Sequence, residues 1–75
     1  MLDMIMTLAS GVFEDADILP TSRLEEAKRF DSMNLVQFII ELSELLDMDI
    51  EDEEVEKTMT FAELAKNLEA KKSLK

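Results

Sequence analysis

Residues 29–46 read RFDSMNLVQFIIELSELL: an arginine and a phenylalanine, then an Asp-Ser pair, then a long apolar segment. The apolar residues recur with the spacing of one helical face, which predicts a helix from Asp31/Ser32 to about Leu46. The centre of its buried stripe is expected at Leu35, Ile39, Leu42 and Leu46, with Phe38 and Leu45 beside it. Asp and Ser both favour the position that caps a helix start, yet each helix has a single cap position. One of the two side chains is therefore not needed as the cap and is available for another role.

Helical spacing also marks the beginning of the chain. Asp3, Thr7 and Ser10 fall at i, i+4 and i+7 among apolar residues, which predicts a helix that lies largely in the core and stops at Gly11. Pro20 disfavours helix in the residue before it, so we expect a long ordered loop over 14–30 with one short turn at 22–28. Three isolated apolar residues would anchor this loop: Ile18, Leu24 and Phe30.

The remainder of the chain completes an all-α prediction. A short helix is expected at 53–57, with Asp52 as its cap, after an acidic turn. Thr60 and Glu63 form a T-x-x-E capping box that predicts the start of the last helix. Basic residues close this helix at the negative end of its dipole: Lys71, Lys72 and Lys75. We expect one domain, residues 1–75, folded as a small bundle of three main helices and one short helix.

The composition limits the classes of function. The chain has no cysteine and no histidine, which excludes disulfides and the usual zinc ligands. Its 18 acidic and 8 basic residues give a formal net charge of −10, which repels nucleic acid and anionic membranes and attracts basic proteins. The apolar N-terminal stretch lacks a basic flank and is too short to span a bilayer. We therefore expect a cytoplasmic, monomeric protein with no nucleic-acid or membrane partner.

The sequence argues against two kinds of site. Residues 47–58 place acids at the first positions of a calcium-binding loop, but Asp52 stands where that loop needs glycine and Thr58 where it needs glutamate. No metal site is predicted. With no histidine and no lysine near it along the helix, Ser32 has no base to activate it as a nucleophile, so we do not expect an enzyme.

The predicted second helix is more apolar than one core face requires. Met33, Val36 and Ile40 form an apolar strip beside the buried stripe. Either the loop 14–30 covers this strip, or the strip is a surface for a partner protein, with Met33 supplying adaptable contact. In the second case its rim is polar and is formed by Gln37, Glu41 and Glu44.

The Asp-Ser pair suggests a modification site. If Asp31 caps the helix, Ser32 becomes the first helical residue and its hydroxyl points outward. It would then lie at the positive end of the helix dipole, among backbone N–H groups without partners, where a phosphate ester is stabilised. The chemistry indicated is a covalent phosphate-linked group.

The stretch FDSMNLVQFIIELSELLDMDIEDEEVEKTMTFAELAKNL, residues 30–68, resembles the second half of acyl carrier proteins. The Asp-Ser-Met start, the helix that follows, the acidic turn and the Thr60-capped last helix carry the resemblance. The sequence departs from the family pattern at Arg29, where glycine is common, and at Asn34, where fatty-acid carriers commonly have an acid. Some similarity to D-alanyl carrier proteins is also present, but the chain lacks the tryptophan of that family.

The resemblance implies a 4′-phosphopantetheine arm on Ser32, installed from coenzyme A by a phosphopantetheinyl transferase. The arm would carry an acyl or aminoacyl group as a thioester between a loading ligase and acyl-processing enzymes, whose basic patches would dock on the acidic second helix. Lys28 and Arg29 would contact the phosphate or remain solvated. The alternative is an unmodified, acidic helical interaction domain that uses the strip of Met33, Val36 and Ile40.

Overall fold

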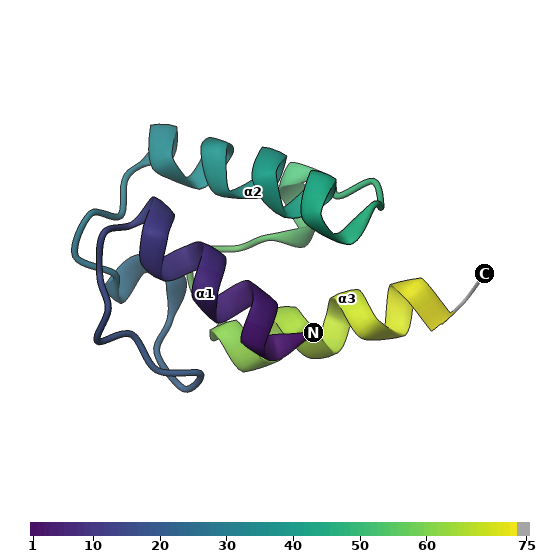
Figure 1. Cartoon of the computed structure of the whole chain (residues 1–75), viewed down its shortest axis with the longest axis horizontal. Helices are drawn as coiled ribbons and strands as arrows, with labels where there is room; N and C mark the ends of the chain where they lie inside the picture. Colours follow the sequence, from purple (N-terminus) through teal and green to yellow (C-terminus); the bar gives the residue numbers. More distant parts are fainter. Residues whose placement is uncertain (74–75) are drawn as a thin grey trace.

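The computed structural model describes residues 1–73, in which the chain is all-helical, as predicted. It forms three α-helices, α1 (Leu2–Val12), α2 (Ser32–Leu46) and α3 (Phe61–Ser73), and two single 3₁₀ turns, η1 (Leu24–Glu26) and η2 (Asp52–Glu54) (Figure 1). The bounds of α2 match the prediction. Lys75, expected near the end of the last helix, lies outside the described residues.

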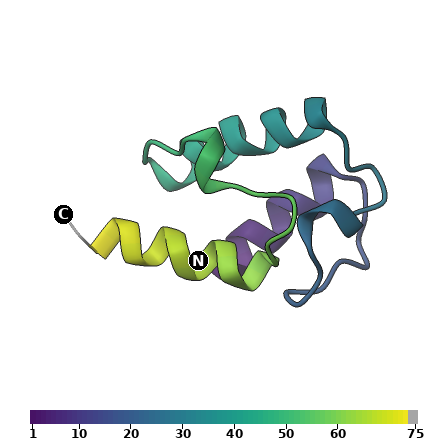
Figure 2. The ribbon, with the colours of Figure 1, turned by 180° about the vertical axis from the view of Figure 1, so that it is seen from behind.

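The helices are arranged around α1, which contacts both α2 and α3. The segment from α2 to α3 crosses the molecule behind α2 in Figure 1 and in front of it in Figure 2. It therefore lies on the face opposite α1. The loop between α1 and α2 folds at the end of the molecule where α2 begins (Figure 1).

Aromatic rings from different parts of the chain meet in the core. Phe13, Phe38 and Phe61 are fully buried, and the ring centroid of Phe38 lies 5.3 Å from that of Phe13 and 6.4 Å from that of Phe61. Phe30 stacks on the outer side of Phe13 at 5.9 Å. Each such pair stabilises the fold by about 0.5–1.5 kcal/mol beyond its burial of area. The rings thus fix the end of α1, the middle of α2 and the start of α3 against one another.

The loop between α1 and α2 is ordered by hydrogen bonds to the segment that precedes α3. The N–H of Leu24 donates to the carbonyl of Met59 at 3.1 Å, and the N–H of Phe61 donates to the carbonyl of Ser22 at 3.2 Å. Leu24 is fully buried, and its turn η1 lies within the predicted turn at 22–28. The loop is thus attached to the α3 end of the fold.

The end of α1 differs from the prediction, because Gly11 is not the stop residue. The helix continues to Val12, and the left-handed residue is Glu14, with φ of 49°. The N–H of Asp15 donates to the carbonyl of Ser10 at 3.0 Å, which closes a Schellman-type cap. Burial of Phe13 in the core sets this end, so the chain turns at Glu14 although glycine would adopt that conformation more easily.

The predicted short helix at 53–57 is wrong. The chain makes only the single turn η2, and Asp52 is its first residue, preceded by Glu51. Val55 is extended, with φ of −119° and ψ of 94°, and its side chain is buried. Because the Val55 side chain is buried, the backbone leaves the helical conformation after one turn. The fold is therefore a three-helix arrangement without a fourth α-helix in residues 1–73.

The start of α3 is as predicted. The hydroxyl of Thr60 accepts a hydrogen bond from the N–H of Glu63 at 3.1 Å, and the Glu63 carboxylate accepts one from the N–H of Thr60 at 3.2 Å. This reciprocal pair is a capping box. Near the other end of α3, Lys71 donates to the Glu54 carboxylate at 2.7 Å and to the Asp49 carbonyl, so α3 holds the acidic segment after α2.

Candidate functional site at the start of α2

Asp31 occupies the cap position of α2. Its backbone is extended, with φ of −154° and ψ of 173°, and its carboxylate accepts a hydrogen bond from the N–H of Asn34 at 2.7 Å. Its carbonyl accepts the first helical bond, from the N–H of Leu35 at 2.9 Å. The Asp-Ser pair therefore has one capping residue, and it is the aspartate.

Ser32 is the first residue of α2, and it is exposed. Its hydroxyl has no hydrogen-bond partner in the part of the chain that the structure describes. The N–H groups of Ser32 and Met33 belong to the first turn, where a helix leaves donors unpaired and the dipole is positive. An oxyanion attached to Ser32 would meet these groups.

The segment that leads into Ser32 is fixed by side chains on both sides of it. The amide nitrogen Nδ2 of Asn34 donates to the carbonyl of Arg29 at 2.7 Å, so Asn34 ties the incoming chain to the first turn of α2. The Asp15 carboxylate accepts a hydrogen bond from the N–H of Lys28 at 3.1 Å. The ring of Phe30 packs against Phe13 between these two ties. Ser32 thus follows an ordered backbone.

The two basic side chains before Ser32 contact acids of the preceding loop. Arg29 Nε lies 3.5 Å from a Glu14 carboxylate oxygen, and Lys28 Nζ lies 3.7 Å from an Asp17 carboxylate oxygen. Both pairs are largely exposed, and such pairs contribute only about 0–1 kcal/mol. A phosphate on Ser32 could therefore compete for either cation at small energetic cost.

The apolar strip of α2 is exposed. Met33 is 80% exposed, Val36 48% and Ile40 49%. Of the two alternatives weighed from the sequence, coverage by the loop 14–30 is wrong, since that loop is hydrogen-bonded to the segment before α3. Gln37 and Glu44 are exposed and Glu41 is half-buried, so the strip has the expected polar rim.

The buried stripe of α2 is as predicted at Ile39, Leu42 and Leu46, but its first central residue, Leu35, is only half-buried, and one edge also differs. Ile39, Leu42 and Leu46 are buried and Phe38 is fully buried, whereas Leu45 is 47% exposed. Leu45 instead lies beside α1, where it helps to line an open groove. A flanking position on a helix wheel can face either the core or a neighbouring helix, and the sequence pattern does not distinguish the two.

Two supporting residues were not recognised from the sequence. Asp15 is one of several acids in the loop, and only the fold shows that it is buried and accepts two backbone hydrogen bonds. The sequence marks Asn34 as a polar residue and a departure from a family pattern, and only the fold shows that its side chain donates to the Arg29 carbonyl. Its position three residues after the Asp31 cap is the available signal that it belongs to the site.

Two further properties bear on the chemistry. Residues 1–73 contain no cluster of three acidic, histidine or cysteine side chains that could hold a metal ion. Across the same range, none of the helices has the length and apolar run that a membrane crossing requires.

The site and the fold together define an acidic helical protein whose second helix begins with a capping aspartate and an exposed serine. The chain is similar to the acyl carrier protein of Rubrobacter xylanophilus, with 38% identity over 50 residues. The similar region covers 67% of this chain and 62% of the relative's length. No family model matches the chain, and no solved structure matches it. This similarity supports the resemblance of the chain to acyl carrier proteins.

Proposed function

We propose that this protein is a carrier that bears 4′-phosphopantetheine on Ser32 through a phosphodiester bond. The observation that carries the proposal is the division of roles in the Asp-Ser pair. The Asp31 carboxylate accepts a hydrogen bond from the N–H of Asn34, whereas the Ser32 hydroxyl is exposed and makes no hydrogen bond within the described chain. A phosphodiester at this place keeps one negative charge, which the positive end of α2 stabilises.

The arm would supply a thiol that holds an acyl or aminoacyl group as a thioester. The residues of this chain would position the arm. Asp31 caps the first turn of α2, and Asn34 holds the backbone that leads into it. Arg29, three residues before Ser32, would contact the phosphate. Catalysis would belong to the partner enzymes. The similarity supports an acyl carrier in general terms, while the pathway (fatty acid, polyketide, peptide or another specialised product) is set by the enzymes that load it.

The docking surface of this carrier would be the strip of Met33, Val36 and Ile40, rimmed by Gln37, Glu41 and Glu44. Its apolar centre and acidic rim fit a partner with an apolar contact surrounded by Lys and Arg. The expected partners are a phosphopantetheinyl transferase, a ligase that loads the cargo, and acyl-processing enzymes, all in the cytoplasm.

The test is covalent modification of the full chain. The protein is incubated with coenzyme A and a promiscuous phosphopantetheinyl transferase, and the intact mass is measured. We expect the gain of one phosphopantetheine, its loss in Ser32→Ala, and its retention in Ser43→Ala. Ser43 is a suitable control because it lies on the same helix and its hydroxyl donates to the carbonyl of Ile39 at 2.8 Å.

The second candidate is an unmodified acidic interaction domain, which the exposed strip on α2 also favours. No mass gain in the wild type with an active transferase would favour this candidate and overturn the carrier. A gain that persists in Ser32→Ala would show that another residue is modified, and it would contradict the assignment of Ser32.

A further inference from the structure

A second apolar surface lies between α1 and α2, and the proposed carrier function does not use it. A groove of about 350 Å³ is open to solvent there, and it is lined by Met4, Thr7, Leu8 and Leu45. Met4 is 43% exposed and Leu45 is 47% exposed, so the two sides of the groove each present an apolar side chain to solvent. Exposed apolar groups that line a groove are typical of an interaction site.

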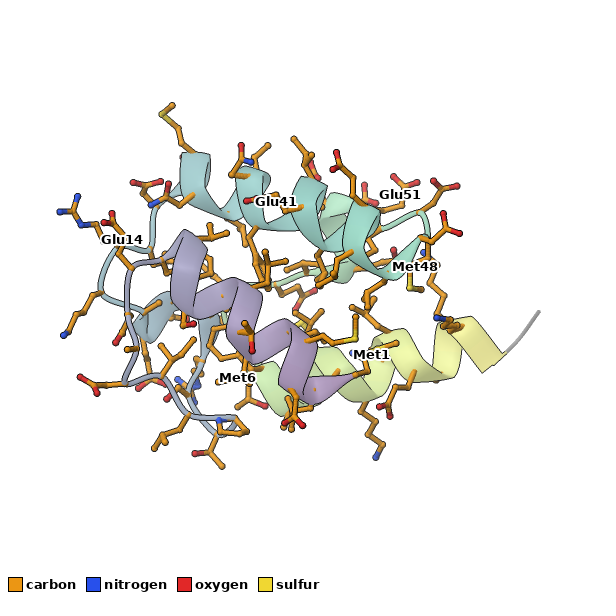
Figure 3. All side chains as sticks on the ribbon, in the orientation of Figure 1. Met1, Met6, Glu14, Glu41, Met48 and Glu51 are labelled. Atoms are coloured by element: carbon orange, nitrogen blue, oxygen red, sulfur yellow. The ribbon has the colours of Figure 1, made fainter. Side chains whose placement is uncertain are left out.

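This groove is separate from the strip that begins at Met33. Ile40 of the strip and Leu45 of the groove are five residues apart, which places them about 140° apart around α2. Glu41 and Glu44 project between these two directions, so a ridge of carboxylates divides the two surfaces. Figure 3 shows Glu41 on the part of α2 that faces the viewer together with α1.

Both sides of the groove carry negative charge. Asp3 precedes Met4 on α1, and Glu41 is one helical turn before Leu45 on α2. Residues 1–22 and 30–56 contain no lysine or arginine, so neither helix carries a basic side chain beside these acids. An occupant must therefore be apolar where it meets Met4 and Leu45 and positively charged where it meets Asp3 and Glu41.

We propose that the α1–α2 groove docks an amphipathic helix of a partner protein, with an apolar residue between Met4 and Leu45 and Lys or Arg beside Asp3 and Glu41. A groove between two helices suits a helical segment, and Met4 can adjust to the side chain that enters. A second copy of this chain fits poorly, because each copy carries a formal net charge of −10. Anionic lipid is disfavoured by the same charge.

The experiment uses the full chain with methionine methyl groups labelled with ¹³C, so that Met4 and Met33 report separately on the groove and the strip. The probe is a synthetic helical peptide of Leu and Lys with all leucines on one face. A peptide of the same composition in scrambled order keeps the charge and loses the apolar face. We expect the amphipathic peptide to shift the Met4 resonance and to leave Met33 nearly unchanged, with much weaker binding of the scrambled peptide.

A matched pair of variants tests the location. Leu45→Gln and Ile40→Gln make the same change on α2 at side chains that are 47% and 49% exposed. We expect Leu45→Gln to weaken peptide binding about tenfold and Ile40→Gln to change it less than about twofold. Thermal unfolding of both variants checks that they fold.

Four results would overturn the proposal. The first is an equal loss of peptide binding in Leu45→Gln and Ile40→Gln, and the second is a shift of the Met33 resonance in place of the Met4 resonance. The third is equally tight binding of the scrambled peptide. The fourth is a shift of the Met4 resonance that decanol causes and the peptide does not. The last would identify an aliphatic ligand. Concentration-dependent dimerisation that Leu45→Gln abolishes would also overturn it, since the occupant would then be a second copy. Because Ser32 plays no part in this test, its outcome is independent of the modification experiment.

Discussion

The carboxylate of Asp15 accepts a hydrogen bond from the backbone N–H of Lys28, thirteen residues along the chain, at 3.1 Å. The other oxygen of the same carboxylate accepts one from the N–H of Asp17 at 3.0 Å. Asp15 is 6% exposed, so the two bonds are partly shielded from water. This side chain therefore joins the end of α1 to the backbone that leads into Ser32.

Replacing Asp15 tests the contribution of these two hydrogen bonds to stability. We expect Asp15→Ala to lower the free energy of unfolding by about 1.5–3 kcal/mol, because it removes a charged acceptor and leaves two partly buried N–H groups without their partner. Asp15→Asn keeps one acceptor oxygen and should cost less. Urea unfolding measures both.

The control is Asp17→Asn. The Asp17 carboxylate is 88% exposed and, within residues 1–73, its one ion pair is with Lys28 at 3.7 Å, so we expect a change of no more than about 0.5 kcal/mol. Equal effects at positions 15 and 17 would contradict the role given to Asp15.

Asp31→Ala tests the cap. Losing the hydrogen bond to the N–H of Asn34 should lower stability by about 0.5–2 kcal/mol and slow the modification of Ser32 by the transferase. Asp31→Asn retains a capping oxygen and should recover most of the stability. If Asp31→Ala left both stability and modification rate unchanged, Asp31 would not be the group that positions Ser32.

Gly11→Ala should stabilise the protein. Gly11 lies inside α1 and is exposed, and a Cβ added there meets no atom within 4 Å. Alanine gains about 0.5–1 kcal/mol over glycine inside a helix, because glycine loses more conformational freedom on folding. A higher midpoint of thermal unfolding is the expected result, and a lower one would indicate that α1 needs glycine after all.

Glu14→Gly is the complementary change. Glu14 has φ of 49°, a left-handed conformation that costs a non-glycine residue about 1–2 kcal/mol. The residue also pairs with Arg29 at 3.5 Å on the surface, a contact of small value. We expect glycine at position 14 to raise the free energy of unfolding by up to about 1 kcal/mol in urea titrations. A clear loss of stability would mean that the Arg29 pair outweighs the backbone strain.

The features that the sequence predicted well are set by neighbouring residues. The start of α2 follows from the Asp31 cap and the apolar spacing after it, and the start of α3 follows from Thr60 and Glu63. Caps and helical spacing act within one or two turns, so a sequence contains them in full. The candidate serine is found by the same local argument.

The features that the sequence did not predict depend on contacts between residues that are far apart along the chain. Burial of Val55 ends η2 after one turn, and hydrogen bonds from the loop to the segment before α3 leave the Met33 strip uncovered. Leu45 faces a groove beside α1 and is 47% exposed. In each case tertiary packing decides between conformations that local preferences allow equally.

The ion pair between Glu54 and Lys71 predicts a specific pH dependence of stability. The pKa of Glu54 is held below its ordinary value of 4.5 by two hydrogen bonds to its carboxylate. The bond from Lys71 has the larger effect, and the bond from the N–H of Glu51 has the smaller one. A carboxyl whose pKa is lower in the folded than in the unfolded state stabilises the fold fully above the unfolded value. That contribution is lost as the pH falls through the lowered folded value.

Lys71→Met should therefore flatten the decline of stability in acid. We expect the free energy of unfolding of the wild type to fall more steeply than that of the variant as the pH is lowered from about 6 to about 3, measured by urea titration at each pH. Lys72→Met is the control, since Lys72 is exposed and the ion pair of Glu54 in the described chain is with Lys71. If Lys71→Met and Lys72→Met gave parallel curves, the general negative charge of the protein, and not this pair, would account for the acid dependence.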